Sequence, residues 1–169
     1  MHARPFIDSL DFARNGQKIS GEVAIAELPR LHDVLANQHG IISYTVQGVV
    51  DKQGSPALDV SISGSCQLLC QRCLNGLDYA IQLDAHLLLR NQASLDALAD
   101  SVAGGEEEEF DSILADAHLD VLDLLEEEIL LSLPIAPKHE FGNCQATEGK
   151  EASEEEQHPF AVLAKLKRN

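Results

Sequence analysis

Cysteine and histidine side chains in two stretches of the sequence have the types and spacing needed to bind a metal ion. Cys70 and Cys73 form a C-x-x-C pair, which lets two thiolates converge on one ion. His139 and Cys144 lie far downstream, five positions apart, and would complete a tetrahedral Cys3His set. Cys66 is an alternative ligand, should one of these four not bind the ion. We therefore name Cys70, Cys73, His139 and Cys144 as a candidate structural zinc site.

Other interpretations of the same cysteines stay open. Ordinary reduced thiols pack well as small hydrophobic side chains, and these residues can be no more than that. A thioredoxin-like redox pair needs Cys70 at the start of a helix, whereas strand, turn and strand are expected here. The spacing Cys66-x3-Cys70-x2-Cys73 matches that of radical S-adenosylmethionine enzymes, but those enzymes alternate helices with strands. The expected surroundings disfavour both redox interpretations.

The sequence carries no pattern typical of a catalytic site. It lacks the G-x-S-x-G elbow, the G-x-x-x-x-G-K-[ST] loop, the H-E-x-x-H helix and the G-x-G-x-x-G turn. Acidic runs at 106–109 and 126–128 fall on an expected loop and on a solvated helix face, where no cleft would support acid–base chemistry. We therefore expect a protein that is not an enzyme.

The negative charge of the chain is concentrated in one segment. The formal net charge is -16, and residues 96–156 contain nineteen Asp and Glu against two Lys. Such a field repels phosphate backbones, which favours a basic protein as the partner over nucleic acid. The simpler interpretation is that the acids only keep the protein soluble. With no signal peptide and no membrane-spanning apolar run, we expect a cytoplasmic protein with reduced thiols and no membrane contact.

The elements that must position the candidate ligands are mainly strands joined by short turns. Alternation of apolar and polar residues predicts four of them, at 18–25, 41–51, 56–68 and 78–90. The turn at 51–55 has hairpin length, and the Cys70 to Cys73 pair links the last two strands. Because no helical crossover separates them, we expect an antiparallel sheet and an α+β class. For residues 4–12 we expect an irregular arm or an edge strand. For residues 28–37 we expect a helix or a helical turn.

One long helix is expected in the C-terminal half, between an N-cap at Asp120 and Pro134. Its apolar stripe consists of Leu122, Leu125, Ile129 and Leu133. Its solvated face consists of Asp123, Glu126 and Glu127. The prolines at 134–137 then hold the chain extended up to His139. A short helix capped by Ser94 is expected at 94–103. We expect one domain over 1–169, with mobile acidic segments at about 100–118 and 145–157 and a small amphipathic helix at 158–167.

Three short motifs occur in the order C-Q-R-C at 70–73, E-E-E-I-L-L-S-L-P-I-A-P-K-H at 126–139 and P-F-A-V-L-A-K-L-K at 159–167. Together, in this order and spacing, they resemble the YceD family, the large ribosomal RNA subunit accumulation proteins of bacteria. The resemblance implies a non-enzymatic role in accumulation or maturation of large-subunit rRNA, and hence in ribosome biogenesis. Many relatives carry further cysteines after the proline run, where this chain offers His139 and Cys144.

The acidic charge adds an expectation about partners. We expect the protein to act through a basic assembly or ribosomal protein, with indirect contact to rRNA. The alternative is a small zinc-binding or thiol-redox module unrelated to RNA.

Overall fold

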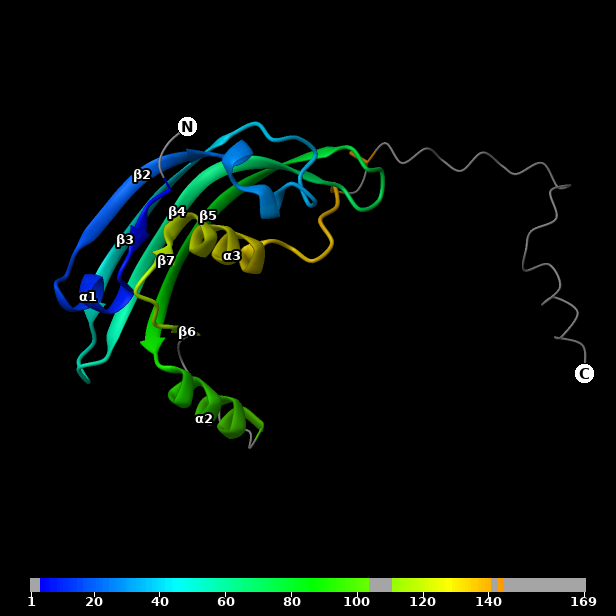
Figure 1. The fold of residues 1–169 in the computed structure, drawn as a ribbon. Helices are drawn as coiled ribbons and strands as arrows, with labels where there is room; N and C mark the ends of the chain where they lie inside the picture. Colours follow the sequence, from blue (N-terminus) through cyan, green and yellow to red (C-terminus); the bar gives the residue numbers. More distant parts are fainter. Residues whose placement is uncertain (1–3, 104–110, 141–142, 145–169) are drawn as a thin grey trace, which may run out of the picture.

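A curved five-stranded sheet, with helices against its concave face, organises the chain (Figure 1). The computed structural model describes residues 4–103, 111–140 and 143–144. The strands follow the chain order across the sheet: β2 (Lys18–Ala24), β3 (Ile41–Val50), β4 (Pro56–Leu69), β5 (Gly76–Arg90) and β6 (Asp111–Leu114).

Strands β2 to β5 pair antiparallel with their neighbours, which confirms the α+β class and the expected hairpins. On β3 and β4 the alternating residues Ile42, Val46, Val60 and Ile62 are almost completely buried. Val46 and Val60 are directly opposite each other in the register. Because one face of the sheet is covered and the other is solvated, period-two alternation was a reliable signal.

Strand β6 departs from the expected antiparallel pattern, because it runs parallel to β5. The connection passes through helix α2 (Gln92–Ala103), as a parallel pair requires. Asn91 caps this helix by accepting a hydrogen bond from the Ser94 N–H at 2.8 Å, so Ser94 is not the cap. The segment 100–118, expected to be mobile, thus includes the end of α2 and a strand. Residues 104–110, and the segments expected at 145–157 and 158–167, lie outside the described residues.

The N-terminal segment forms an edge strand, which is one of the two forms expected at 4–12. It also forms a helix that the sequence did not predict. Strand β1 (Phe6–Ile7) pairs with β7 (Leu119–Asp120), and helix α1 (Ser9–Arg14) follows. Helix α1 crosses β3 at Gly48, where an added Cβ would lie 2.2 Å from the backbone oxygen of Phe12. Only glycine permits this close approach.

Residues 25–34 form short helical turns, so of the two forms expected at 28–37 the helical turn is present and the longer helix is not. They are the 3-10 helices η1 (Ile25–Glu27) and η2 (Pro29–Leu31). Leu28 and Leu31 are fully buried. Backbone hydrogen bonds then attach the following residues to the end of β4, because Ala36 N–H donates to Gln67 and Leu69 N–H donates to Val34. This segment covers the side of the core opposite the sheet.

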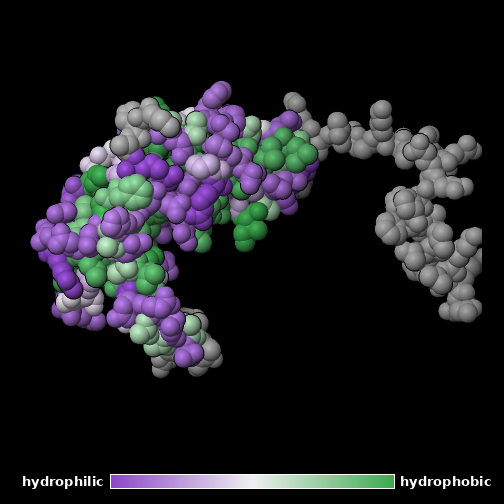
Figure 2. Space-filling model, viewed as in Figure 1, coloured by the Kyte–Doolittle hydropathy of each residue, from purple (hydrophilic) through white to green (hydrophobic). Residues whose placement is uncertain are grey.

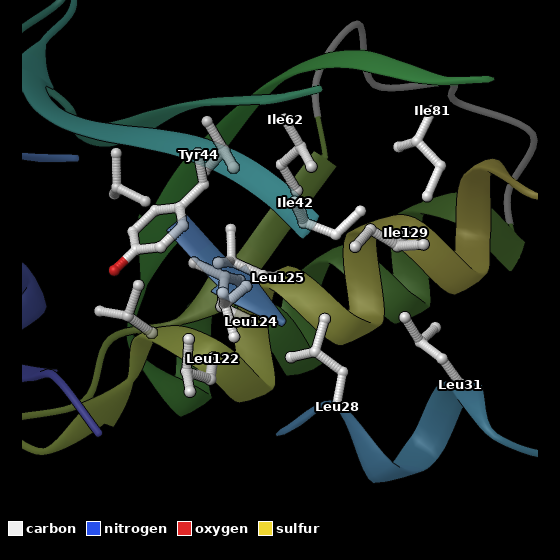
Figure 3. Packing of buried hydrophobic residues seen from close by; sticks show 14 of the residues in the cluster. Leu28, Leu31, Ile42, Tyr44, Ile62, Ile81, Leu122, Leu124, Leu125 and Ile129 are labelled. Carbon is white, nitrogen blue, oxygen red and sulfur yellow. The ribbon is translucent and has the colours of Figure 1, made fainter. Parts of the chain in front are cut away.

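Helix α3 (Val121–Ser132) lies in the concave face of the sheet, between the strands and the 3-10 turns (Figures 1 and 3). The expected N-cap is confirmed, since the Asp120 carboxylate accepts from Leu122 N–H at 2.9 Å. Leu125 and Ile129 are buried among residues of the sheet and of the turns. The helix has twelve residues, as α2 does, so the expected single long helix is not confirmed. No described helix is long and apolar enough to cross a membrane.

The expected solvated face of α3 is wrong at Glu126, which is 1% exposed. Its carboxylate accepts a hydrogen bond from the Arg30 N–H at 2.9 Å. The Arg30 guanidinium lies 3.7 Å from Asp123 and 3.9 Å from Glu127. The 3-10 turns therefore cover part of the acidic face as well as the apolar stripe. Helical periodicity could not show this, because the covering segment lies about a hundred residues earlier in the chain.

Glu128 is the second buried acid of α3, at 9% exposure. Burial raises the pKa of its carboxyl, and the neighbouring charges of Asp111 and Glu127 raise it further. The ionised form is therefore less favourable in the folded protein than in the unfolded chain.

Substitution of Leu125 by alanine tests whether α3 holds the core together. We expect Leu125→Ala to lower the free energy of unfolding by about 2–5 kcal/mol, because a fully buried leucine leaves a cavity. The matched control is Leu131→Ala on the same helix, where the side chain is 75% exposed and the change should stay within about 0.5 kcal/mol. Urea unfolding followed by circular dichroism measures both. Equal losses would mean that α3 is not docked as described.

Substitution of Glu128 by glutamine should stabilise the protein near pH 7. A raised folded pKa means that wild-type stability is greatest when Glu128 is protonated and falls as the pH rises through that pKa. Glutamine removes this loss. The gain should therefore vanish below about pH 4.5, the ordinary pKa of the group, where both states are protonated. Melting temperatures across this range measure the gain, with the exposed Glu27→Gln as control. A gain that persists at low pH would refute the assignment.

Candidate metal centre

The turn between β4 and β5 holds the first two candidate ligands. The two strands pair up to Leu69 and Gly76. Within the turn, Cys70 N–H donates to Asn75 at 2.9 Å and Leu74 N–H donates to Cys70 at 2.9 Å. Leu74 adopts a φ of 60°, in the left-handed region. These constraints fold the turn tightly, and Cys70 and Cys73 come from its two sides.

The segment after α3 brings the other two ligands to the same turn. Leu133 N–H donates to Ile129 and closes the helix, after which the prolines carry the chain towards the end of the sheet. Gln71 N–H then donates to the Pro137 carbonyl at 2.9 Å. This backbone bond docks the segment on the cysteine turn just before His139.

All four predicted ligands meet there. Their ligand atoms lie within 4.8 Å of one another. The Sγ atoms of Cys70 and Cys144 are 3.9 Å apart, and Cys73 Sγ is 3.4 Å from His139 Nδ1. Zinc with bonds of about 2.3 Å to sulfur and 2.0 Å to nitrogen needs tetrahedral ligand separations of roughly 3.5–3.8 Å. The arrangement therefore suits a tetrahedral ion with small adjustments.

The imidazole of His139 is oriented by a backbone group. Its Nε2 lies 3.0 Å from the Gly76 carbonyl oxygen, which can only accept a hydrogen bond. Nε2 therefore carries the proton, and Nδ1 presents its lone pair to the cluster. Such an outer hydrogen bond fixes the tautomer and ring orientation of a metal-binding histidine.

Cys70 is favoured as a thiolate. Burial raises the pKa of its thiol, but hydrogen bonds from the backbone of Cys73, Arg72 and His139, and from the Cys73 side chain, outweigh burial and lower it to about 5. A thiolate is the form that binds metals and also the form that acts as a nucleophile. The side chain is fully buried, which shields it from solution reagents.

Cys66 stays outside the cluster. It lies on β4 with its side chain in the hydrophobic core, and burial raises its pKa. The three neighbouring cysteines thus do not converge on one point, as a three-cysteine iron–sulfur site would require.

The supporting atoms of the centre were not found from the sequence. The Gly76 and Pro137 carbonyls and the Gln71 N–H are backbone groups, so residue type carries no signal for them. The proline run before His139 was the one sequence feature that pointed to an extended segment leading to the metal centre.

Comparisons with known proteins identify the family. The family model described as large ribosomal RNA subunit accumulation protein YceD matches residues 58–167. The chain is also similar to the protein of that name from Haemophilus influenzae, with 26% identity over 168 residues, covering 95% of this chain and 94% of the relative. No solved structure matches the chain. Because the matched region contains the cysteine turn, α3 and the segment that follows it, and exceeds half of the chain, the protein belongs to the YceD family.

Proposed function

We propose that this protein supports the accumulation of large-subunit ribosomal RNA in the cytoplasm, as a non-enzymatic factor in ribosome biogenesis. The observation that carries the proposal is the family match, which spans residues 58–167. The relative named for the same role aligns over nearly the full length of both chains, so the role named belongs to a protein of similar length.

The partner in this proposal is a basic assembly or ribosomal protein, and contact with rRNA is indirect. The net charge of -16 supports it, because a surface this acidic repels phosphate groups and attracts basic proteins. Ribosomal proteins are the basic components of the particle whose RNA accumulates.

The cofactor in this proposal is a structural zinc ion held by Cys70, Cys73, His139 and Cys144. The donor set and its geometry support it. Ligation would join positions 70 and 144, which are 74 residues apart, and would fasten the turn to the segment after α3. Such a closure stabilises the fold by reducing the freedom of the unfolded chain.

A small zinc-binding or thiol-redox module unrelated to RNA is the second candidate. The low pKa of Cys70 next to Cys73 is the observation that favours a redox pair. Against it stands the full burial of Cys70, since an exchange partner must reach the attacking sulfur. Both forms of the second candidate differ from the first in the effect of deletion on rRNA, and the redox form differs also in metal content.

Metal analysis tests the zinc site. We expect about one zinc ion per chain in protein purified without chelator, and much less in Cys70→Ser and Cys144→Ser, which each remove a thiolate ligand. Cys66→Ala is the matched control and should keep its zinc. Closing a loop of this length is worth roughly 4 kcal/mol, so chelation should lower the melting temperature by on the order of 10 °C.

The zinc assignment fails if the wild-type protein is metal-free and chelation leaves its melting temperature unchanged. A Cys70–Cys73 disulfide forming reversibly in metal-free protein would support the redox candidate instead.

Deletion of the gene tests the role in rRNA. We expect the ratio of large-subunit to small-subunit rRNA to fall, and the wild-type gene to restore it, because the proposal requires the protein for accumulation of the large-subunit molecule. In binding assays at physiological salt, the purified protein should capture a basic ribosomal or assembly protein and not naked rRNA. An unchanged rRNA ratio contradicts the role, and retention of naked rRNA without any captured protein contradicts the indirect mechanism.

A further inference from the structure

A groove separate from the metal centre lies between α3 and the outer part of β5. Its volume is about 330 Å³, and its walls include Asp84 on β5, Asp111 at the start of β6, and Glu128 and Leu131 on α3. The metal centre shares no residue with it.

Glu128 is an acid of this groove to which no described residue supplies a counter-charge. The residue is 9% exposed overall and lines the groove, and its carboxylate oxygens are not fully enclosed. In the described part of the chain it has no hydrogen bond or ion pair. Placing a carboxylate in such surroundings without a partner is unfavourable, and nearby Asp111 adds repulsion. An incoming cation would remove both costs.

The described residues that line the groove include no Lys or Arg. His86 is the one basic residue among the described lining residues, and its Nδ1 is already paired with Asp59 Oδ1. Asp84 accepts a hydrogen bond from the Ser61 hydroxyl and keeps its negative charge. The carboxylates of the groove are therefore available to positive charges from another molecule.

The groove also exposes apolar surface, because Leu131 lines it and is 75% exposed. Ile135, which follows α3 but does not line the groove, is fully exposed. In Figure 2 a hydrophobic group projects from the segment that follows α3, among mostly hydrophilic surroundings. An inorganic cation would use the acids but would leave Leu131 in water. A ligand that carries both positive and apolar side chains uses both.

We propose that the groove between α3 and β5 binds a basic, amphipathic segment of a protein, with Lys or Arg at Asp84, Asp111 and Glu128 and an apolar side chain on Leu131. This inference rests on the proposed function and assigns the contact surface for its basic partner. Charge complementarity identifies the occupant: the groove carries three acids, and ribosomal proteins are rich in exposed Lys and Arg.

Site-specific cross-linking tests the surface. The probe is the protein mixture released from purified large ribosomal subunits, added to full-length chain with p-benzoylphenylalanine in place of Leu131. We expect a cross-link, identified by mass spectrometry, to a Lys- or Arg-rich segment of a ribosomal protein. The triple variant Asp84→Asn, Asp111→Asn, Glu128→Gln should bind that purified protein about tenfold more weakly. The control variant Glu22→Gln, Glu27→Gln, Asp33→Asn removes the same charge elsewhere and should bind within about twofold of wild type.

Several results would overturn the proposal. Cross-linking of position 131 to residues of the chain's own C-terminal segment, or to a second copy, would assign the groove another occupant. Equal weakening in both triple variants would reduce the effect to net charge. If the groove variant binds the purified protein as tightly as wild type does, this surface is rejected. The proposed function then still stands, provided that deletion of the gene lowers the ratio of large-subunit to small-subunit rRNA.

Discussion

The packing of α3 into the concave face of the sheet is the interaction on which the rest of the structure depends. Its apolar side chains meet Ile42 and Ile62 of the strands on one side and Leu28 of the 3-10 turns on the other (Figure 3). Because the helix is held from both sides, its axis and its end are fixed relative to the strands. The chain that leaves Ser132 is thereby directed to the turn that joins β4 and β5.

Two surfaces of different character result from this one placement. At the end of the sheet, the segment after α3 docks on the cysteine turn and completes a set of soft ligands. Along the side of the helix, Glu128 faces β5 and β6 with unfavourable electrostatics that none of the described residues relieves. The first surface favours a stable structure, and the second is suited to recognition of a positively charged partner. A protein can retain a local cost of this kind when binding offsets it.

Much of the sheet, and the grouping of Cys70, Cys73, His139 and Cys144, could be predicted from the sequence, because alternation and residue type report directly on them. Ile42 to Val46 and Leu58 to Ile62 alternate because one face is buried, and Asp120 precedes its helix with typical capping chemistry. The rest depended on distant contacts. Helix α1 has only six residues, β6 has four and pairs through a crossover, and the burial of Glu126 requires Arg30. Such features are set by tertiary packing, which local patterns do not encode.

We propose that a metal ion joins the cysteine turn to the segment after α3. Zinc-edge X-ray absorption of the purified full-length protein measures the coordination shell directly. The proposed Cys3His site predicts three sulfur ligands at about 2.3 Å and one nitrogen at about 2.0 Å, supplied by Cys70, Cys73, Cys144 and His139. A shell of oxygen and nitrogen alone, or four sulfur ligands with Cys66 recruited from the core, would contradict it.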